Sequence, residues 1–183
     1  MWTTVGLVLL VLAGGVLLLA ALKPAEFRVE RRVSINAPAA SIHPLLDDFH
    51  RWEAWSPWEH IDATMQRTFS GAPSGPGAIY EWRGEGKAGA GRMEILAAPV
   101  PQRVTIRLDF IKPFASSNTT EFTLVPQGHV TEVQWIMRGP NAFVTRVMTV
   151  FVSMDQLVGK DFEAGLANLK AAAEGTKPVP VGG

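Results

Sequence analysis

The first 22 residues of the chain contain no charged side chain, and this property limits where the rest of the protein can work. From Thr3 to Leu22 nearly every residue is Leu, Val, Ala or Gly, and Lys23 closes the run. Such a helix is roughly 30 Å long at about 1.5 Å per residue, which is the thickness of the hydrocarbon core of a bilayer. The sequence therefore predicts a single-pass membrane anchor over residues 1–23.

A cleaved secretory signal is the alternative interpretation of this segment. Signals begin with basic residues, have a shorter apolar core and end at a small-x-small cleavage site. Here no Lys or Arg precedes the apolar run, and Ala20 and Ala21 are followed by Leu22 and Lys23. We favour the uncleaved anchor. A buried core helix is favoured less, because the chain has no second apolar segment of this length to pack against it.

Basic residues follow the apolar segment and predict its orientation. The positive-inside rule counts Lys and Arg close to the ends of a span. Lys23, Arg28, Arg31 and Arg32 lie after the segment, and only the chain amine lies before it. We therefore expect a cell-membrane protein whose C-terminal domain lies in the cytoplasm. Arg28 to Arg32 contribute less to this prediction if they belong to a folded strand.

Composition excludes several kinds of function. The 17 Lys and Arg residues balance the 17 Asp and Glu residues, so no net positive field favours a nucleic-acid partner. The chain has no cysteine, which excludes disulfides, thiolate nucleophiles and Cys-ligated metals. Residues 24–174 are long enough for one domain with a hydrophobic core. The last segment, 175–183, reads GTKPVPVGG and is predicted to be a disordered tail.

Alternating patterns predict seven strands. Residues 27–35 place four apolar side chains on one face, with Arg31 as the one charge among them. The clearest later strand is 103–110, where Val104, Ile106, Leu108 and Phe110 alternate with polar residues. Short glycine- and proline-containing links join the later strands, which favours an antiparallel meander. The other predicted strands are 63–70, 78–83, 90–97, 118–126 and 130–138.

Three helical segments are expected around these strands. A first helix starts after Asn36-Ala37-Pro38, and Pro44 inside it predicts a kink or a short, broken helix. A second, short segment covers 49–54. Apolar residues recur at steps of three and four over 141–173, which predicts one long amphipathic helix, with Gly159 as the candidate position for a bend.

The order of elements predicts an α+β fold: a curved seven-stranded antiparallel sheet around a long C-terminal helix, preceded by the membrane-spanning helix. The long helix is the one element large enough to cover the apolar face of such a sheet. A curved sheet wrapped around one helix also leaves space that side chains need not fill. We expect a ligand cavity between them.

Four sequence motifs resemble one known group of proteins. They are Ser34-Ile-Asn-Ala-Pro38, Phe49-His-Arg-Trp-Glu-Ala-Trp-Ser-Pro-Trp58, Gly75-Pro-Gly-Ala-Ile-Tyr-Glu-Trp82 and Gly159-Lys-Asp-Phe-Glu-Ala-Gly-Leu-Ala-Asn-Leu-Lys170. Together they resemble the START-like superfamily, also called SRPBCC or polyketide cyclase/dehydrase proteins, and a bacterial, often membrane-anchored branch of it. The resemblance implies the helix-grip fold. It also implies binding of lipids, sterols, polyketides or other apolar molecules, with catalysis in a minority of members; fold alone does not choose between these functions.

Large aromatic and sulfur-containing side chains are the candidate ligand-binding residues. A core role is the usual alternative for each of them. Trp55 and Trp58 flank Ser56-Pro57 in a predicted loop, where we considered a pocket rim, a membrane-interface contact and a structural plug. The full set of candidates is Trp52, Trp55, Trp58, Tyr80, Trp82, Phe110, Phe122, Trp135, Met137, Phe151 and Met154.

No catalytic, metal or cofactor motif stands out. Residues 84–89 spell GxGxxG, but a predicted strand follows rather than the helix that a dinucleotide site requires. Glu59, His60 and Asp62 are interpreted as a solvated loop rather than a cation site. We therefore predict no cofactor, no metal and no catalytic residue.

Three hypotheses follow for function. The first is a membrane-anchored module that binds a hydrophobic small molecule or lipid between the sheet and the last helix. The second is a polyketide cyclase or dehydratase, for which Tyr80, Glu94 and Arg107 are the available polar contributors. The third is a domain with a filled core that contacts a protein partner, whose identity the sequence does not give.

Overall fold

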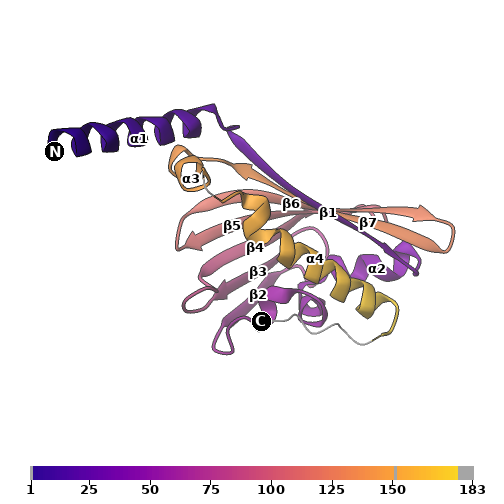
Figure 1. Cartoon of the computed structure of the whole chain (residues 1–183). Helices are drawn as coiled ribbons and strands as arrows, with labels where there is room; N and C mark the ends of the chain where they lie inside the picture. The colour runs from indigo at the N-terminus through magenta and orange to yellow at the C-terminus, as the bar shows by residue number, and fades with distance from the viewer. Residues whose placement is uncertain (1, 151, 177–183) are drawn as a thin grey trace.

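The protein forms one antiparallel sheet that curves around a C-terminal helix, as the computed structural model shows (Figure 1). The structure describes residues 2–150 and 152–176. The helices are α1 (Trp2–Leu22), α2 (Ala39–Leu46), the short 3₁₀ segments η1 (Phe49–Ala54) and η2 (Pro57–His60), α3 (Phe143–Met148) and α4 (Met154–Ala173). The strands are β1 (Glu26–Ile35), β2 (Gln66–Gly71), β3 (Ala78–Arg83), β4 (Ala90–Ala97), β5 (Arg103–Lys112), β6 (Ser116–Gln127) and β7 (Val130–Pro140).

The sheet confirms the predicted helix-grip architecture. Its strand order is β1-β7-β6-β5-β4-β3-β2, so β2 to β7 form a meander and β1 joins at the far edge beside β7. All neighbouring pairs are antiparallel. The predicted alternation of β5 holds in the structure, because Val104 and Ile106 are completely buried while Arg103 and Arg107 are exposed.

The first helix of the domain is short, as Pro44 predicted. It spans Ala39–Leu46 and ends two residues after the proline. Asp48 then accepts a hydrogen bond from the backbone N–H of His50 and caps η1. Helix α2 follows the end of β1 and contacts β5, β6 and η1, while η1 also contacts β3 and α4.

The predicted long helix over 141–173 is wrong in one respect, because the structure divides it into α3 and α4. Helix α3 ends at Met148, and α4 begins after Ser153, whose hydroxyl accepts from the backbone N–H of Gln156 while the Gln156 side chain accepts from Ser153 N–H. This capping box gives α4 its own start. The apolar period continues across the break, which is why periodicity alone did not reveal it.

Gly159, the candidate position for a bend, lies inside the continuous helix α4 and makes room there for Arg31. The Arg31 guanidinium is bonded to Asp155 and Glu163 on α4, with Nη1 to Asp155 Oδ1 and Nε to Glu163 Oε1 both at 2.7 Å. A Cβ at Gly159 would lie 2.2 Å from Arg31 Nη2. Arg31, the one charge on the apolar face of β1, therefore holds α4 against that strand.

Helix α1 projects from the domain and its side chains are largely exposed (Figure 1). Among the described residues it is the helix long and apolar enough to span a bilayer, a property that a signal sequence shares. Its C-terminal end contacts α3, and Lys23 Nζ donates to the Thr149 carbonyl. Asn141 Nδ2 also donates to the Pro24 carbonyl at 3.1 Å, so the junction between helix and domain is hydrogen-bonded.

Candidate functional site

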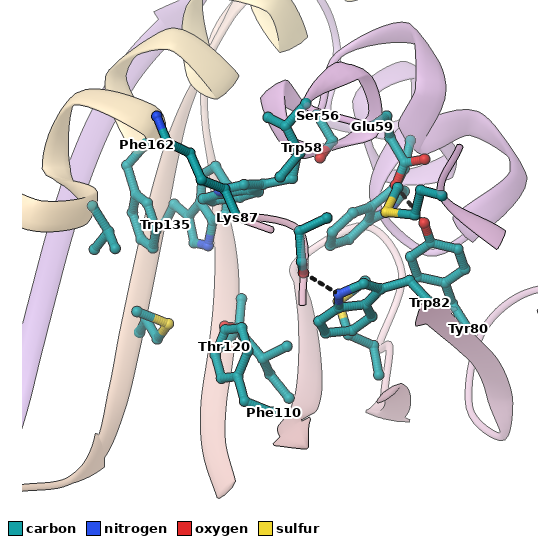
Figure 2. Close-up of a pocket in the computed structure, with 18 residues that line it drawn as sticks. Ser56, Trp58, Glu59, Tyr80, Trp82, Lys87, Phe110, Thr120, Trp135 and Phe162 are labelled. Atoms are coloured by element: carbon teal, nitrogen blue, oxygen red, sulfur yellow. Dashed lines mark hydrogen bonds between the residues drawn. The ribbon is translucent and has the colours of Figure 1, made fainter. Parts of the chain in front are cut away.

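A cavity of about 230 Å³ lies between the sheet and α4. Its walls come from η1, η2, the inner faces of β3 to β7 and the first half of α4 (Figure 2). Aromatic and aliphatic side chains make most of the lining, with a few polar groups at its margins. The volume exceeds the roughly 150 Å³ that holds a benzene molecule and lies just under the range of about 300–1,000 Å³ usual for small-molecule sites.

Most of the predicted aromatic residues line this cavity. Tyr80 and Trp82 lie on β3 and Phe110 on β5, and their rings stand next to one another, with centroids of Trp82 and Phe110 5.9 Å apart. The opposite wall is formed by Trp58 and Trp135, whose rings meet edge to face at 5.6 Å. The predicted residues in the lining are Trp52, Trp58, Tyr80, Trp82, Phe110, Trp135 and Met137.

The remaining predicted residues lie elsewhere. Trp55 and Phe122 are almost completely buried in the filled core and do not contribute to the lining. Trp55 Nε1 donates to the Leu45 carbonyl of α2 at 2.8 Å. Of the three roles proposed for Trp55, a rim, a membrane contact and a structural plug, its position fits the structural one. Met154 sits at the start of α4 outside the lining, and Phe151 lies outside the described residues.

The sequence analysis missed a buried polar cluster at one end of the cavity. The Tyr80 hydroxyl donates to Glu59 Oε1 at 2.8 Å, and Arg67 Nε donates to Glu59 Oε2 at 2.7 Å (Figure 2 shows the Tyr80 bond). Arg67 Nη2 also bonds the Glu59 carbonyl. Glu59 is only 6% exposed, so interpreting it as part of a solvated loop was wrong. Segment η2, which begins at Pro57, turns it inward.

The position of Arg67 in β2 is the one sequence feature that indicates this cluster. Strand β2 places Arg67 opposite Trp82 and Phe69 opposite Tyr80, so an arginine shares the strand face of two inward aromatics. A cation beside a buried surface needs a carboxylate partner, because leaving it unpaired there is costly. Glu59 was the available acid in the preceding segment.

The electrostatics of the cluster keep Tyr80 protonated. Burial raises the pKa of Tyr80 well above its ordinary value, and the negative charge of Glu59 raises it further. The hydrogen bond to Glu59 likewise raises the pKa of Arg67. At neutral pH the Tyr80 phenol is therefore neutral and donates to Glu59, and both side-chain oxygens of Glu59 already accept hydrogen bonds.

The other polar candidates do not converge. Glu94 and Arg107 bond each other at 2.5 Å outside the cavity lining, on the strand positions that alternate with the buried Met93 and Ile106. Asp62 accepts from Glu85 N at 2.8 Å, and His60 Nε2 lies 3.1 Å from the Glu53 carbonyl, so neither joins Glu59. Within residues 2–150 and 152–176, no group of three His, Cys, Asp or Glu is placed to hold a metal ion.

The GxGxxG sequence forms the turn between β3 and β4. Gly89 has φ +58°, and a Cβ there would lie 2.4 Å from the Lys112 carbonyl, so the turn needs glycine to pack against the end of β5. Strand β4 follows, as expected, and supplies no helix N-terminus for a pyrophosphate. The Trp82 indole N–H donates to the Ala88 carbonyl at 2.9 Å, which fixes this turn beside the cavity.

Comparison of the sequence with known protein families identifies the family of this chain. Residues 26–174 match the family described as "Polyketide cyclase / dehydrase and lipid transport". The chain belongs to this family. The match begins at the start of β1 and ends just after α4, so it includes every element of the cavity and leaves α1 outside. No curated protein matches the sequence.

Solved structures show that the fold of this family member is shared. A protein from Chromobacterium violaceum is similar with a TM-score of 0.57 and 14% identity, covering 83% of this chain and 99% of its own. A protein from Nitrosospira multiformis has a TM-score of 0.58 and 18% identity, covering 79% and 94%. A protein from Thermobifida fusca has a TM-score of 0.55 and 21% identity, covering 82% and 96%. At these identities the likeness concerns the fold.

Proposed function

We propose that this family member is a membrane-anchored protein that binds a hydrophobic small molecule or lipid between its sheet and α4. The observation that carries the proposal is the cavity of about 230 Å³ with an aromatic and aliphatic lining. Burying apolar surface contributes about 25 cal/mol per Å², so a hydrophobic molecule gains free energy by leaving water for such a site. The family description, which includes lipid transport, supports the same class of ligand.

The polar groups of the cavity narrow the chemistry of the ligand. Glu59, Tyr80 and Arg67 already satisfy one another and offer little to a cation or an acid. Trp135 Nε1 is buried and has no hydrogen-bond partner among the described residues. A buried donor without an acceptor costs about 1–3 kcal/mol, which a ligand oxygen would recover. We therefore expect a mainly apolar ligand that carries a carbonyl or hydroxyl oxygen.

Anchoring by α1 is part of the proposal. Its length and its exposed apolar surface favour a membrane span over a helix packed on the domain. Lys23 follows it directly, and the positive-inside rule then places the domain in the cytoplasm. The intact mass of protein extracted from membranes tests this: an anchor retains residues 1–23, whereas a cleaved signal does not.

Ligand binding is tested on the full chain in detergent. Native mass spectrometry should detect a co-purified lipid, and a panel of fluorescent fatty acids and sterols should give saturable binding. Val158→Trp places an indole in the cavity and should weaken binding at least about tenfold, since the ligand and the ring compete for one volume. Leu157→Trp is the matched control, because Leu157 is 56% exposed and outside the lining.

Two results would contradict the proposal. One is the absence of any bound lipid together with no binding across the panel. The other is unchanged affinity in Val158→Trp, which would locate the ligand outside the cavity.

A cyclase or dehydratase activity is the second candidate, and the Glu59–Tyr80 pair favours it. Two ionisable groups in one cavity are the minimum for acid–base catalysis. Here, however, the Tyr80 proton is bound to Glu59 and the Tyr80 pKa is raised, so a substrate oxygen would have to displace that bond. Dehydration of a β-hydroxy ketone to an enone, followed by ultraviolet absorbance, tests this. An enzyme should lose activity in both Glu59→Gln and Tyr80→Phe.

A further inference from the structure

One end of the sheet, which we call the anchor end, contains both the attachment of α1 and the turns β3–β4 and β5–β6. The register shows this step by step: Glu26 of β1 lies opposite Pro140, and Arg138 lies opposite Thr119. In the same way Ser116 lies opposite Phe110, and Lys112 opposite Ala90. In Figure 1, α1 points away from the domain on this side, and α3 lies beside it.

The anchor end presents exposed apolar side chains. Phe114, in the connection from β5 to β6, is 68% exposed, and Ile111, next to the last residue of β5, is 58% exposed. Phe143 of α3 is also largely exposed. Exposed phenylalanine and isoleucine side chains contribute little to the core, whereas inserting them into the boundary of a bilayer removes their apolar surface from water.

Basic residues accompany these apolar side chains. Lys87 and Lys112 are exposed in or next to the two turns, and Lys23 and Arg146 lie at the junction of α1 and α3. Glu26, Glu85 and Asp62, which accepts from the Glu85 backbone N–H, are acidic residues at the same end. The turns at the opposite end, 72–77, 98–102 and 128–129, contain no lysine or arginine, and Arg103 directly follows the second of them. Attraction to anionic headgroups is worth about 1 kcal/mol per basic residue near the surface, so the two ends differ in affinity for a membrane.

The cavity opens at the anchor end. Among its lining residues, Ile61 and Lys87 are the exposed ones, and Lys87 lies in the β3–β4 turn. Figure 2 shows Lys87 reaching across the cavity toward Phe162 and Trp135. A molecule that enters between Ile61 and Lys87 therefore passes beside the turns that carry the exposed apolar and basic residues.

We propose that the anchor end lies on the surface of an anionic bilayer, with Phe114 and Ile111 inserted at the headgroup boundary and the cavity opening against the lipid. The proposal rests on the proposed function for the anchor and adds a second contact that fixes the orientation of the domain. The hydrogen bonds between the end of α1 and the domain restrain the domain at one point only, and a domain held away from the bilayer would pass its ligand through water. A docked end instead lets an apolar ligand move between bilayer and cavity with little exposure to water.

The absence of cysteine makes a direct test possible, because single-cysteine variants carry one spin label each. The full chain is placed in nanodiscs that contain phosphatidylglycerol, and label depth is measured from the relative accessibility to oxygen and to a nickel chelate. The positions are Phe114→Cys at the anchor end, Val100→Cys in the β4–β5 turn and Leu12→Cys in the middle of α1. Val100 is the matched control, because it is 69% exposed but lies at the opposite end of the sheet.

We expect the label at position 12 to be deep, the label at 114 to lie at the headgroup boundary and the label at 100 to be in water. If 12 is deep while 114 and 100 are equally aqueous, docking is wrong and the anchor stands. If 12 is aqueous, the anchor itself is wrong. Phe114→Asp should slow ligand transfer from labelled vesicles about tenfold, since one apolar side chain no longer inserts, without changing affinity for ligand added in detergent. Unchanged transfer would also overturn the proposal.

Discussion

The inner face of the sheet has two halves with similar sequence patterns. One is packed with buried side chains, and the other lines the cavity. Along β5, Val104 and Ile106 are completely buried, whereas Leu108 and Phe110 face the cavity. Along β6, Phe122 is completely buried and Thr120 lines the cavity. We call these the filled half and the hollow half. The alternation of apolar and polar residues in β5 does not change between them, so the strands themselves do not decide which half is hollow.

The helices decide which half of the sheet face is hollow. In the filled half, α2 contributes Ile42 and Leu46, and Trp55 directly after η1 adds its ring to the space above the sheet. In the hollow half, α4 makes most of its sheet contacts with β1, and Val158 and Phe162 are the α4 residues in the lining of the cavity. The comparison teaches that the placement of the helices, and not the pattern of the strands, separates the filled half from the hollow half.

The largest expected effect on the free energy of unfolding comes from replacing one phenylalanine by alanine in each half. Phe122→Ala removes a ring from a filled region and should reduce the free energy of unfolding by about 3–5 kcal/mol. Phe110→Ala only enlarges an existing cavity around a half-buried ring and should cost about 1–2 kcal/mol. Urea unfolding of the full chain in detergent, followed by tryptophan fluorescence, measures both. Equal losses would show that the hollow half is packed like the filled one.

Glu59→Gln tests the polar cluster of the hollow half. The substitution keeps the shape of the side chain but leaves Arg67 without its carboxylate, and Arg67 is itself partly exposed. We expect a loss of about 1–3 kcal/mol in the same unfolding experiment. Glu53→Gln is the control, because Glu53 is exposed on η1 and should change stability little. A loss no greater than that of the control would contradict a structural role for Glu59.

The ionisation of Tyr80 reports whether the hollow half excludes water. Tyr80 is the one tyrosine in the chain, so tyrosinate absorbance follows this residue alone. Burial, and then Glu59, raise its pKa in the folded state. We therefore expect titration well above the ordinary pKa of about 10, and a lower value in Glu59→Gln that still exceeds 10.

The same shift predicts a loss of stability at alkaline pH. Above about pH 10 the unfolded chain releases the tyrosine proton while the folded chain retains it, so the free energy of unfolding falls as pH rises toward the folded-state pKa. Tyr80→Phe should remove this part of the pH dependence. A Tyr80 that titrates near 10 would mean that the cavity is open to water.

The smallest expected effect on stability concerns the ion pairs between β1 and α4. Arg31→Gln removes the ion pairs to Asp155 and Glu163, both of which are largely exposed carboxylates. Exposed pairs contribute little, so we expect a loss of about 1 kcal/mol or less, and a smaller one at high salt. Unfolding at two salt concentrations measures it. A loss as large as that of Phe122→Ala would mean that charge, rather than packing, fixes α4.

The sequence predicted the elements of the fold better than the positions of individual side chains. The positions of the strands followed from alternation, and the short first helix followed from Pro44. The break before α4 was missed although Ser153 and Gln156 spell a capping box, because the apolar period runs through it. Most of the aromatic candidates line the cavity. Trp55 and Phe122 are also large aromatic residues in similar sequence patterns, yet they lie in the core.

By itself, the sequence determined the order of the strands and the approximate positions of most elements, and that the N-terminal segment is apolar enough for a bilayer. These are local properties, since alternation and helical period depend on neighbours along the chain. Only the tertiary structure decided that Glu59 turns inward to Tyr80, that Arg31 joins β1 to α4 and that the hollow half is open. Each of these depends on distances between segments far apart in the chain, which pairing and packing set and no local pattern encodes.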